Sequence, residues 1–467
     1  MASRILLISA NSYAVPYPVF PLGLAQLDVA LRGAGHQVEW IDCLADTDPV
    51  EERVRCFQPD VVGVSLRNID DVAFRKQATF HGTLVTLCQR IRQCRPGCRI
   101  VVGGSGFSIF PRELLGRSGA DFGVQGEGEA GLLALLDALE QGTNYRQIPG
   151  LVFRDEGEIK CNPQRPARLD DTNTLPERPE HLVDYYLQHS LMLNLQTQRG
   201  CGFECCYCTY PLIEGRRHRR RAAAAVAEEF ARLADRGVPY VFVVDSVFNS
   251  SPAHVIEICE AILERGVQLK WGCFLRPQGL DHRQMELLAA AGLSHIEFGS
   301  DSFSDRVLSA YRKHLQFADI RASAELAAAH KIEQCHFLIL GGPGETRDTL
   351  EETLRNSRQL PDAVVLPVVG MRVYPGTAVY DEARRLGVLP TDEALLEPFH
   401  FVAPGLDAAF IQDRLQTFVR EHPNWIVGEP PASFHRLVQR LRSRQIAGPL
   451  WTYFAMLQKL PPNLGTP

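Results

Sequence analysis

Residues 201 to 208 read Cys-Gly-Phe-Glu-Cys-Cys-Tyr-Cys, and three of the four cysteines fall in the spacing C-x₃-C-x₂-C. These three are Cys201, Cys205 and Cys208, whereas Cys206 lies out of register. Three thiolates on so short a loop do not surround one tetrahedral zinc ion, which usually takes four protein ligands or three and a water. They can hold three corners of a cubane iron–sulfur cluster and leave the fourth iron open to a small molecule. A reactive or zinc-binding cysteine group is the alternative.

The N-terminal third alternates short apolar segments with longer amphipathic ones. This alternation predicts a parallel, doubly wound sheet, whose ligands bind beyond the carboxyl ends of the strands. Glycines at such ends let a backbone approach a ligand closely, although Gly-Gly after a strand is also ordinary turn chemistry. The predicted strands are residues 4–8, 37–41, 59–65, 98–102 and 121–124, and a helix is predicted at 22–35.

The cysteine spacing resembles the signature of the radical S-adenosylmethionine (SAM) enzymes, in which the open iron of a [4Fe-4S] cluster binds SAM. Six strand–helix units after residue 190 match the partial (β/α)₆ barrel of that family, whose catalytic loops follow the strands. The segment upstream of the cysteine loop resembles the cobalamin-binding domain of cobalamin-dependent radical SAM enzymes. The stretches that carry this second resemblance are residues 16–24, which read Pro-Tyr-Pro-Val-Phe-Pro-Leu-Gly-Leu, and residues 126–129, which read Gly-Glu-Gly-Glu.

The resemblance assigns SAM contacts to the ends of the barrel strands. Asp245 stands where the family places polar groups for the SAM amino group, with a helix N-cap as the alternative role. Arg276 is expected to bind the SAM carboxylate or the substrate. Asp301 replaces a longer glutamate that reaches the ribose hydroxyls in relatives. The full predicted SAM set is Asp245, Arg276, Ser300, Asp301, Ser302, Gly341 and Arg372.

The cobalamin contacts are assigned in the same way, with one departure from the family. Many cobalamin domains carry a cobalt-ligating histidine in the sequence Asp-x-His-x-x-Gly after the first strand. Residues 11–18 contain no histidine, and the nearest one, His36, follows the next helix. We therefore expect Arg67 or Asn68 near the lower face of the corrin. The predicted set is Tyr17, Ser65, Leu66, Arg67, Asn68, Gly103, Gly104, Gly126, Glu127 and Gly128. The alternative is a degenerate module that binds no corrin.

The predicted organisation has four parts. An α/β Rossmann-like cobalamin-binding domain covers residues 1–140, and a linker covers 141–190. The radical SAM partial barrel covers 191–385, and a small, mostly helical region covers 386–467. The chain has 467 residues, enough for two to three domains that each bury a core.

The amino-acid composition restricts the possible partners and the cellular compartment. The net charge is −6 with 22% charged residues, which does not favour nucleic acid as a partner. No apolar run is long enough for a membrane-spanning helix. Thirteen cysteines without regular disulfide spacing favour a reducing cytoplasm.

The resemblance implies reductive cleavage of SAM to a 5′-deoxyadenosyl radical, and methylation of an unactivated carbon of a small molecule with cobalamin as methyl carrier. The alternatives are a cyclisation or rearrangement without net methylation, and a non-catalytic ligand-binding protein. The substrate stays open among natural-product, lipid, tetrapyrrole and peptide classes. The basic stretch Gly215–Arg221 reads as a solvated helix start, or as a docking site for an electron donor such as flavodoxin or ferredoxin.

Overall fold

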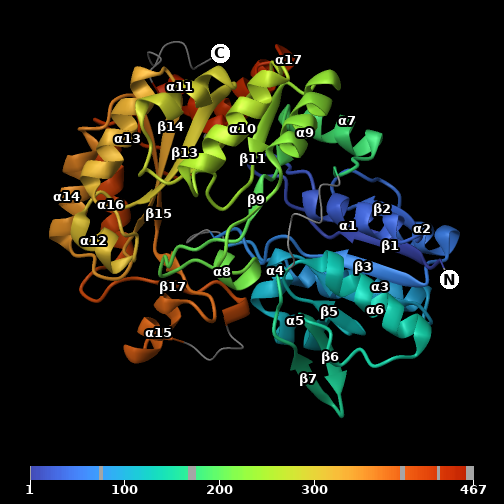
Figure 1. Ribbon diagram of the computed structural model, residues 1–467. Coiled ribbons are helices and arrows are strands. Elements are labelled where there is room, and N and C mark those ends of the chain that lie inside the picture. The colour runs from blue at the N-terminus through green and yellow to red at the C-terminus, as the bar shows by residue number, and fades with distance from the viewer. Residues whose placement is uncertain (1, 73–76, 167–174, 390–394, 429–431, 459–467) are drawn as a thin grey trace.

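A computed structural model describes residues 2–72, 77–166, 175–389, 395–428 and 432–458 (Figure 1). Side chains of a few residues at the C-terminal helices, and all of residues 459–467, fall outside this description. The predicted fold class is confirmed: an N-terminal doubly wound sheet precedes a six-stranded parallel barrel sheet, and the chain ends in helices. In Figure 1 the two sheets lie beside each other, and β9 and α8 lie between them.

The N-terminal sheet has the strand order β2-β1-β3-β4-β5-β6-β7. The first five strands are parallel, and alternate residues of β1 pack into the two hydrophobic cores on opposite faces of the sheet. All five predicted strands are present. The strands are β1 Arg4–Ser9, β2 Gln37–Asp42, β3 Val61–Ser65, β4 Arg99–Gly103, β5 Phe122–Val124, β6 Leu151–Asp155 and β7 Glu158–Cys161; the helices are α1 Leu22–Gly33, α2 Val50–Phe57, α3 His81–Cys94, α4 Ser105–Ile109, α5 Pro111–Ser118 and α6 Gly128–Gln141.

The hairpin β6–β7 pairs antiparallel with β5 and extends the N-terminal sheet. These strands lie in the segment 141–190 that was expected to be a linker, and so does helix α7, Glu180–Ser190. Part of this segment therefore belongs to the first sheet. The exact boundaries between the domains stay a prediction.

The barrel sheet has the order β15-β14-β13-β12-β11-β8, with every neighbouring pair parallel. Each predicted barrel strand is present within a few residues. The strands are β8 Leu193–Leu195, β11 Tyr240–Val243, β12 Lys270–Leu275, β13 Leu293–Asp301, β14 Glu333–Leu340 and β15 Ala363–Val369; the helices are α9 Ala223–Asp235, α10 Pro252–Glu264, α11 His282–Ala290, α12 Asp305–Ala310, α13 Phe317–Ala329 and α14 Arg347–Ser357.

Short elements connect and close the barrel. The cysteine loop runs from β9, Gln198–Arg199, to α8, Tyr210–Ile213, and β10, Arg219–Arg220, pairs with β9. Past β15 the chain forms β16 Met371–Arg372, α15 Ala378–Arg385, β17 His400–Phe401, α16 Ala408–Val419, α17 Ala432–Ser443 and α18 Leu450–Gln458. None of the described helices is long and apolar enough to cross a bilayer.

Candidate active site between the two sheets

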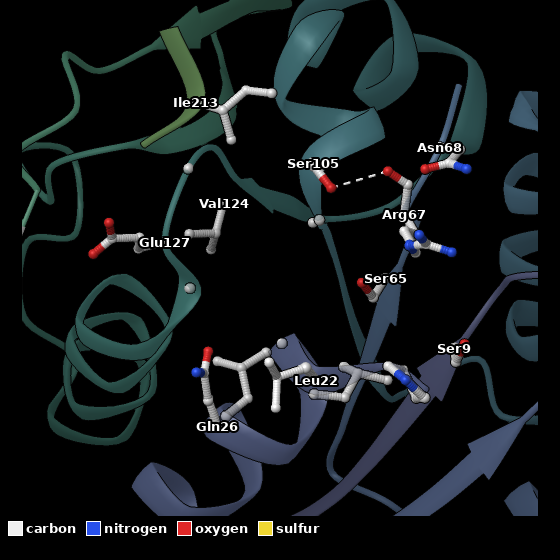
Figure 2. A pocket seen from close by; sticks show the side chains of 18 of the residues that line it. Ser9, Leu22, Gln26, Ser65, Arg67, Asn68, Ser105, Val124, Glu127 and Ile213 are labelled. Carbon is white, nitrogen blue, oxygen red and sulfur yellow. Dashed lines mark hydrogen bonds between the residues drawn. The ribbon is translucent and has the colours of Figure 1, made fainter. Parts of the chain in front are cut away.

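A cavity of about 600 Å³ lies where the carboxyl ends of the N-terminal strands face the cysteine loop (Figure 2). Strand ends β1, β3 and β4, the turn before α6, and helix α1 form one part of its wall. Thr209, Tyr210 and Ile213, which follow the cysteine loop, form another part. Arg67 and Glu127 lie on opposite sides of the space in Figure 2. This one cavity therefore borders the predicted cobalamin region and the segment that follows the cysteine loop, but neither the three cysteines nor the predicted SAM contacts are among the residues that line it.

The cysteine loop is held by backbone hydrogen bonds. The Cys201 N–H donates to the carbonyl of Gly215 at 3.0 Å, and the Cys208 N–H donates to the carbonyl of Cys205 at 3.2 Å. Cys206 points away from this turn, because its sulfur packs 3.8 Å from the sulfur of Met371 in the buried core. The predicted separation of roles, three candidate ligands and one bystander, thus has a structural basis.

The three loop cysteines stay the predicted cluster ligands. Within the described residues, no three His, Cys, Asp or Glu side chains are grouped closely enough to hold one metal ion. Burial, together with the charges of Cys205 and Cys201, raises the pKa of Cys208 to about 12. Binding to iron would supply the positive charge that favours the thiolate.

Asp301 and Lys313 form a buried ion pair beside the loop. Lys313 Nζ lies 2.7 Å from Asp301 Oδ2, and both side chains are almost completely buried. The Tyr207 hydroxyl donates to the same Asp301 oxygen at 2.7 Å. This network joins the end of β13 to the cysteine loop. Sequence reasoning did not select Tyr207 or Lys313: the first lies inside the C-x₂-C spacing, but the second follows α12 without any motif.

Arg276 also lies beside the cluster loop. Its guanidinium stands 4.4 Å over the ring of Phe203 and donates to the carbonyl of His314 at 3.0 Å. Desolvation lowers the pKa of Arg276, while the charges of Cys205 and Asp301 raise it. The predicted roles of Arg276 and Asp301 towards SAM stay predictions.

The other predicted SAM residues have partners inside the protein. Asp245 accepts hydrogen bonds from the backbone N–H groups of Thr197 and Gln198, at 2.7 and 3.2 Å, and burial raises its pKa to about 7. It does not cap helix α10, whose N-cap is Ser251. The remaining contacts are Ser300 Oγ with His336 Nδ1 at 2.8 Å, Ser302 Oγ with Thr353 Oγ1 at 3.3 Å, and the Gly341 N–H with the Glu345 carboxylate.

The guanidinium of Arg372 forms hydrogen bonds within the protein. Its Nε donates to Asp70 Oδ2 at 2.9 Å, and its two terminal nitrogens donate to the carbonyls of Val373 and Leu395 at 2.7 and 2.8 Å. Every guanidinium nitrogen thus has an internal partner. The ion pair joins the barrel to the N-terminal domain, and the assignment of Arg372 to SAM stays a prediction that these contacts do not favour.

Eight of the ten predicted cobalamin residues line the cavity; they are Ser65, Arg67, Asn68, Gly103, Gly104, Gly126, Glu127 and Gly128. Leu66 is buried in the second core and does not line it. Tyr17 packs instead against Met192, Tyr240 and Phe242 of the barrel. Tyr17 was assigned to cobalamin from its position in the sequence. That position does not show that its side chain packs against the barrel.

At the end of β4, Gly103 and Gly104 form a glycine wall, a part of the cavity wall that carries no side chains. A Cβ on Gly104, whose φ is +94°, would lie 2.5 Å from the carbonyl oxygen of Leu66. The Ser105 hydroxyl donates to the carbonyl of Arg67 at 2.9 Å and fixes the neighbouring turn (Figure 2). Internal packing against the end of β3 therefore requires glycine at position 104, and the cavity meets backbone without side chains at Gly103 and Gly104, which fits a flat corrin.

Arg67 is the cationic side chain at this wall. Solvent reaches it through the cavity, while the surrounding protein lowers the pKa of its guanidinium by desolvation and the nearby Tyr210 and Tyr186 raise it. No histidine is among the described residues that line the cavity. His36 accepts a hydrogen bond from the Ser3 N–H at 3.2 Å, beyond the amino end of the sheet.

Two arginines tie the wall of the cavity to the cysteine loop. Arg199, two residues before Cys201, lies 2.7 Å from Glu129 and 3.5 Å from Glu127. Arg219 donates to Glu127 at 2.9 Å and to the carbonyl of Glu214 at 2.7 Å. Within the basic stretch, Arg219 therefore bonds to other parts of the protein, while Arg216 and Arg217 are exposed.

Comparisons with known proteins agree with this geometry. Residues 195–356 match the family model "Radical SAM superfamily", and residues 9–136 match "B12 binding domain". Tryptophan 2-C-methyltransferase of Streptomyces laurentii is 25% identical, over 78% of this chain and 72% of its own length. An anaerobic magnesium-protoporphyrin IX monomethyl ester cyclase of Cereibacter sphaeroides is 27% identical, over 72% of this chain and 56% of its own length.

Among solved structures, the radical SAM methyltransferase TsrM from Kitasatospora setae, described with cobalamin and a [4Fe-4S] cluster bound, superposes with a TM-score of 0.86. The alignment covers 98% of each chain at 24% identity, so the two proteins share their fold. The two family models together match more than half of the chain, in the order that the sequence predicts. The chain belongs to the cobalamin-dependent radical SAM enzymes.

Proposed function

We propose that the protein is a C-methyltransferase that uses a [4Fe-4S] cluster, SAM and cobalamin to methylate a poorly activated carbon of a small molecule. The observation that carries the proposal is the shared cavity: the glycine wall of the N-terminal sheet and the residues after the cysteine loop border one space. A carrier and a methyl donor bound there would meet without crossing solvent. The methyltransferase named among the relatives supports the same reading.

The bound groups would supply electron transfer to SAM and a cobalt that carries a methyl group. The chain holds and orients them. Cys201, Cys205 and Cys208 are the proposed cluster ligands, and Gly103 and Gly104 the corrin wall. The ion pair of Lys313 with Asp301 lies beside the cysteine loop and holds it through the Tyr207 hydroxyl. Both side chains would keep water away from the loop.

We also propose that Arg67 lies at the lower face of the corrin in place of a histidine. A guanidinium stays protonated and offers no lone pair, so it cannot ligate cobalt. It would keep a sixth ligand away and repel positive charge on the metal. This arrangement favours a cobalt with fewer axial ligands.

Two further proposals concern the cellular compartment and the electron donor. All thirteen cysteines of the chain are free, which favours a reducing compartment such as the cytoplasm. An acidic one-electron donor of the flavodoxin or ferredoxin class would suit the exposed Arg216 and Arg217, which lie next to the cluster loop.

Anaerobic reconstitution tests the proposed function. We expect one cubane cluster by EPR and about one retained corrin, whose visible spectrum lacks a nitrogen ligand from the protein. Incubation with SAM and a strong low-potential reductant, which converts the bound corrin to cob(I)alamin, should yield S-adenosylhomocysteine and methylated cobalamin even without substrate. A cluster-loaded protein that retains no corrin would contradict the proposal. Cleavage to 5′-deoxyadenosine alone, without S-adenosylhomocysteine, would favour the cyclase or rearrangement alternative, for which the named cyclase relative is the supporting observation.

The glycine wall gives a specific prediction. Gly104→Ala should reduce corrin retention at least tenfold, because its Cβ would overlap the Leu66 carbonyl and displace the end of β3. Gly142→Ala is the matched control: Gly142 also has positive φ, +66°, but a Cβ there meets nothing within 4 Å. Retained corrin is measured by absorbance after gel filtration. Equal retention by the two variants would show that this wall does not hold the corrin.

A further inference from the structure

Glu297 is a buried carboxyl group of the barrel that belongs to no predicted cofactor contact and has no cationic partner among the described residues. Glu297 lies in the middle of β13, in register with Phe274 of β12 and Cys335 of β14. Neighbours in register in a parallel sheet point to the same face. Cys335 packs with the C-terminal helices on the inner face, whereas Ile296 and Phe298 pack into the outer core with the barrel helices. Glu297 therefore points into the barrel.

Glu297 has little compensation for its burial. It is 7% exposed, and its one hydrogen-bond donor among the described residues is Trp451 Nε1 of α18, at 3.0 Å. No described cation forms an ion pair with it, and desolvation raises its pKa to about 7. A carboxylate has about four acceptor sites, so most of its bonding capacity is unused.

A second polar group lies on the same part of the inner wall. Among the described residues, the buried Tyr240 hydroxyl has no hydrogen-bond partner, and it lies against the backbone of Gly272, where a Cβ would come within 2.1 Å of it. Gly272 is in register with His295, two residues before Glu297 in β13. A buried hydroxyl without a partner costs free energy unless a ligand or water satisfies it. Two groups with unused hydrogen-bonding capacity therefore lie on neighbouring positions of the inner wall.

The inner wall beside these groups is apolar and becomes exposed at Val368. Phe242 and Phe274 pack edge to face with ring centroids 5.1 Å apart, and Tyr17 from the N-terminal domain packs against Phe242. Val368 of β15 is in phase with Val364, which packs on the inner face, and yet it is 47% exposed. An inward side chain that is so exposed indicates open space at the carboxyl end of the barrel.

Val244 connects this space with the cobalamin cavity. Its side chain packs against the cluster of Met192, Tyr240 and Phe242, and Val244 also lines the cavity. Tyr17 of the N-terminal domain packs against the same cluster. The apolar space and the cobalamin cavity are neighbours.

We propose that Glu297 and Tyr240 form the polar floor of the substrate site, and that the substrate is a small aromatic or largely apolar molecule that donates an N–H or O–H group to Glu297. The aromatic walls hold the apolar body, and the floor fixes the end that lies away from the corrin. The assignment rests on the proposed function, because it needs the reacting carbon to face the cobalamin cavity. It narrows the substrate classes, since an aliphatic lipid without a donor group would leave both floor groups unsatisfied.

The test uses the full chain loaded with cluster and cobalamin, and a panel of paired fragments that differ only in the donor: indole with benzofuran, aniline with toluene, and phenol with fluorobenzene. Binding is measured by ligand-observed NMR titration. We expect at least one donor-bearing member to bind about tenfold more tightly than its partner, as a hydrogen bond to a charged group allows. A panel in which no donor-bearing member is preferred would overturn the proposal.

Three variants separate recognition from a purely structural role. Glu297→Met removes the acceptor at similar volume and should reduce the preference to less than twofold. Glu297→Gln keeps an acceptor for both the ligand and Trp451, so this variant should retain most of the preference for the donor-bearing fragment. Trp451→Phe removes only the internal donor and should leave the preference intact. A preference that survives in Glu297→Met, in protein with unchanged thermal stability and corrin content, would also overturn the proposal.

Formation of S-adenosylhomocysteine without substrate is recorded for the same preparations. If methyl transfer to cobalamin proceeds but no donor preference is found, only the substrate-site assignment fails. If the preference is found and depends on Glu297 while methyl transfer is absent, the proposed function fails and the binding site stands.

Discussion

Alanine at Cys201, Cys205 or Cys208 is expected to abolish the iron–sulfur cluster, whereas alanine at Cys206 is expected to keep it. A cubane that is held by three thiolates has no spare protein ligand, so the loss of any one should lower activity by at least a thousandfold. Cys206 lies in the same loop, but its sulfur packs against Met371 in the core. Iron and sulfide content and the EPR spectrum after anaerobic reconstitution give the result directly.

The four variants control one another, because all change a cysteine of the same eight-residue loop. Cys206→Ala removes one buried sulfur and should cost only about 1 kcal/mol of stability, with cluster content near that of the wild type. Loss of the cluster in Cys206→Ala, or a cluster that persists in Cys205→Ala, would refute the assignment of ligands. Retained cobalamin in all four proteins would show that the N-terminal domain remains folded.

Arg372→Ala is expected to destabilise the contact between the two domains by about 3–5 kcal/mol, the usual effect of leaving a buried charge without its partner. Asp70 is completely buried and Arg372 is 3% exposed. Without the guanidinium, the donors that remain to the Asp70 carboxylate among the described residues are the Val72 N–H at 2.9 Å and the Tyr374 hydroxyl at 3.3 Å. We expect a lower thermal midpoint and faster hydrogen exchange in β16 and in the segment around Asp70.

Arg414→Ala is the matched control for this prediction. Arg414 pairs with Glu351 on the surface, where the carboxylate is 46% exposed, and surface ion pairs contribute about 1 kcal/mol or less. Its effect on the thermal midpoint should be small. If both substitutions lower the midpoint equally, the ion pair between the domains does not hold them together. If Arg372→Ala lowers SAM affinity at unchanged stability, the assignment to SAM is favoured instead.

The sequence was sufficient for the order of the elements because periodicity is a local property. Strands β1 and β2 begin at residues 4 and 37, as the sequence predicts, since apolar runs set their positions. The same reasoning missed that β6 and β7 extend the first sheet. Nothing in Leu151–Asp155 itself shows which strand it will pair with, and that choice depends on the exposed edge of β5.

The residues of the candidate site could be predicted only where they lie together in one short segment of the chain. The cysteine spacing and the glycines after β4 are contiguous, so their meaning could be inferred from the sequence. Arg372 was assigned to SAM because it ends a barrel strand, but its partner Asp70 lies 302 residues earlier in the chain. Lys313 and Glu297 escaped notice for the same reason: their importance comes from burial beside distant segments, which no local pattern reports.

The two sheets meet through the loops at the carboxyl ends of their strands, and this arrangement bears on how new activities arise in such a chain. Part of the cavity wall comes from loops and turns, but Leu7 and Leu24 belong both to that wall and to the first hydrophobic core. A loop can change its side chains without disturbing the packing of either domain, whereas a substitution at Leu7 or Leu24 alters the cavity and the core together. New substrates are therefore reached more easily through the loops than through the core residues of the cavity wall.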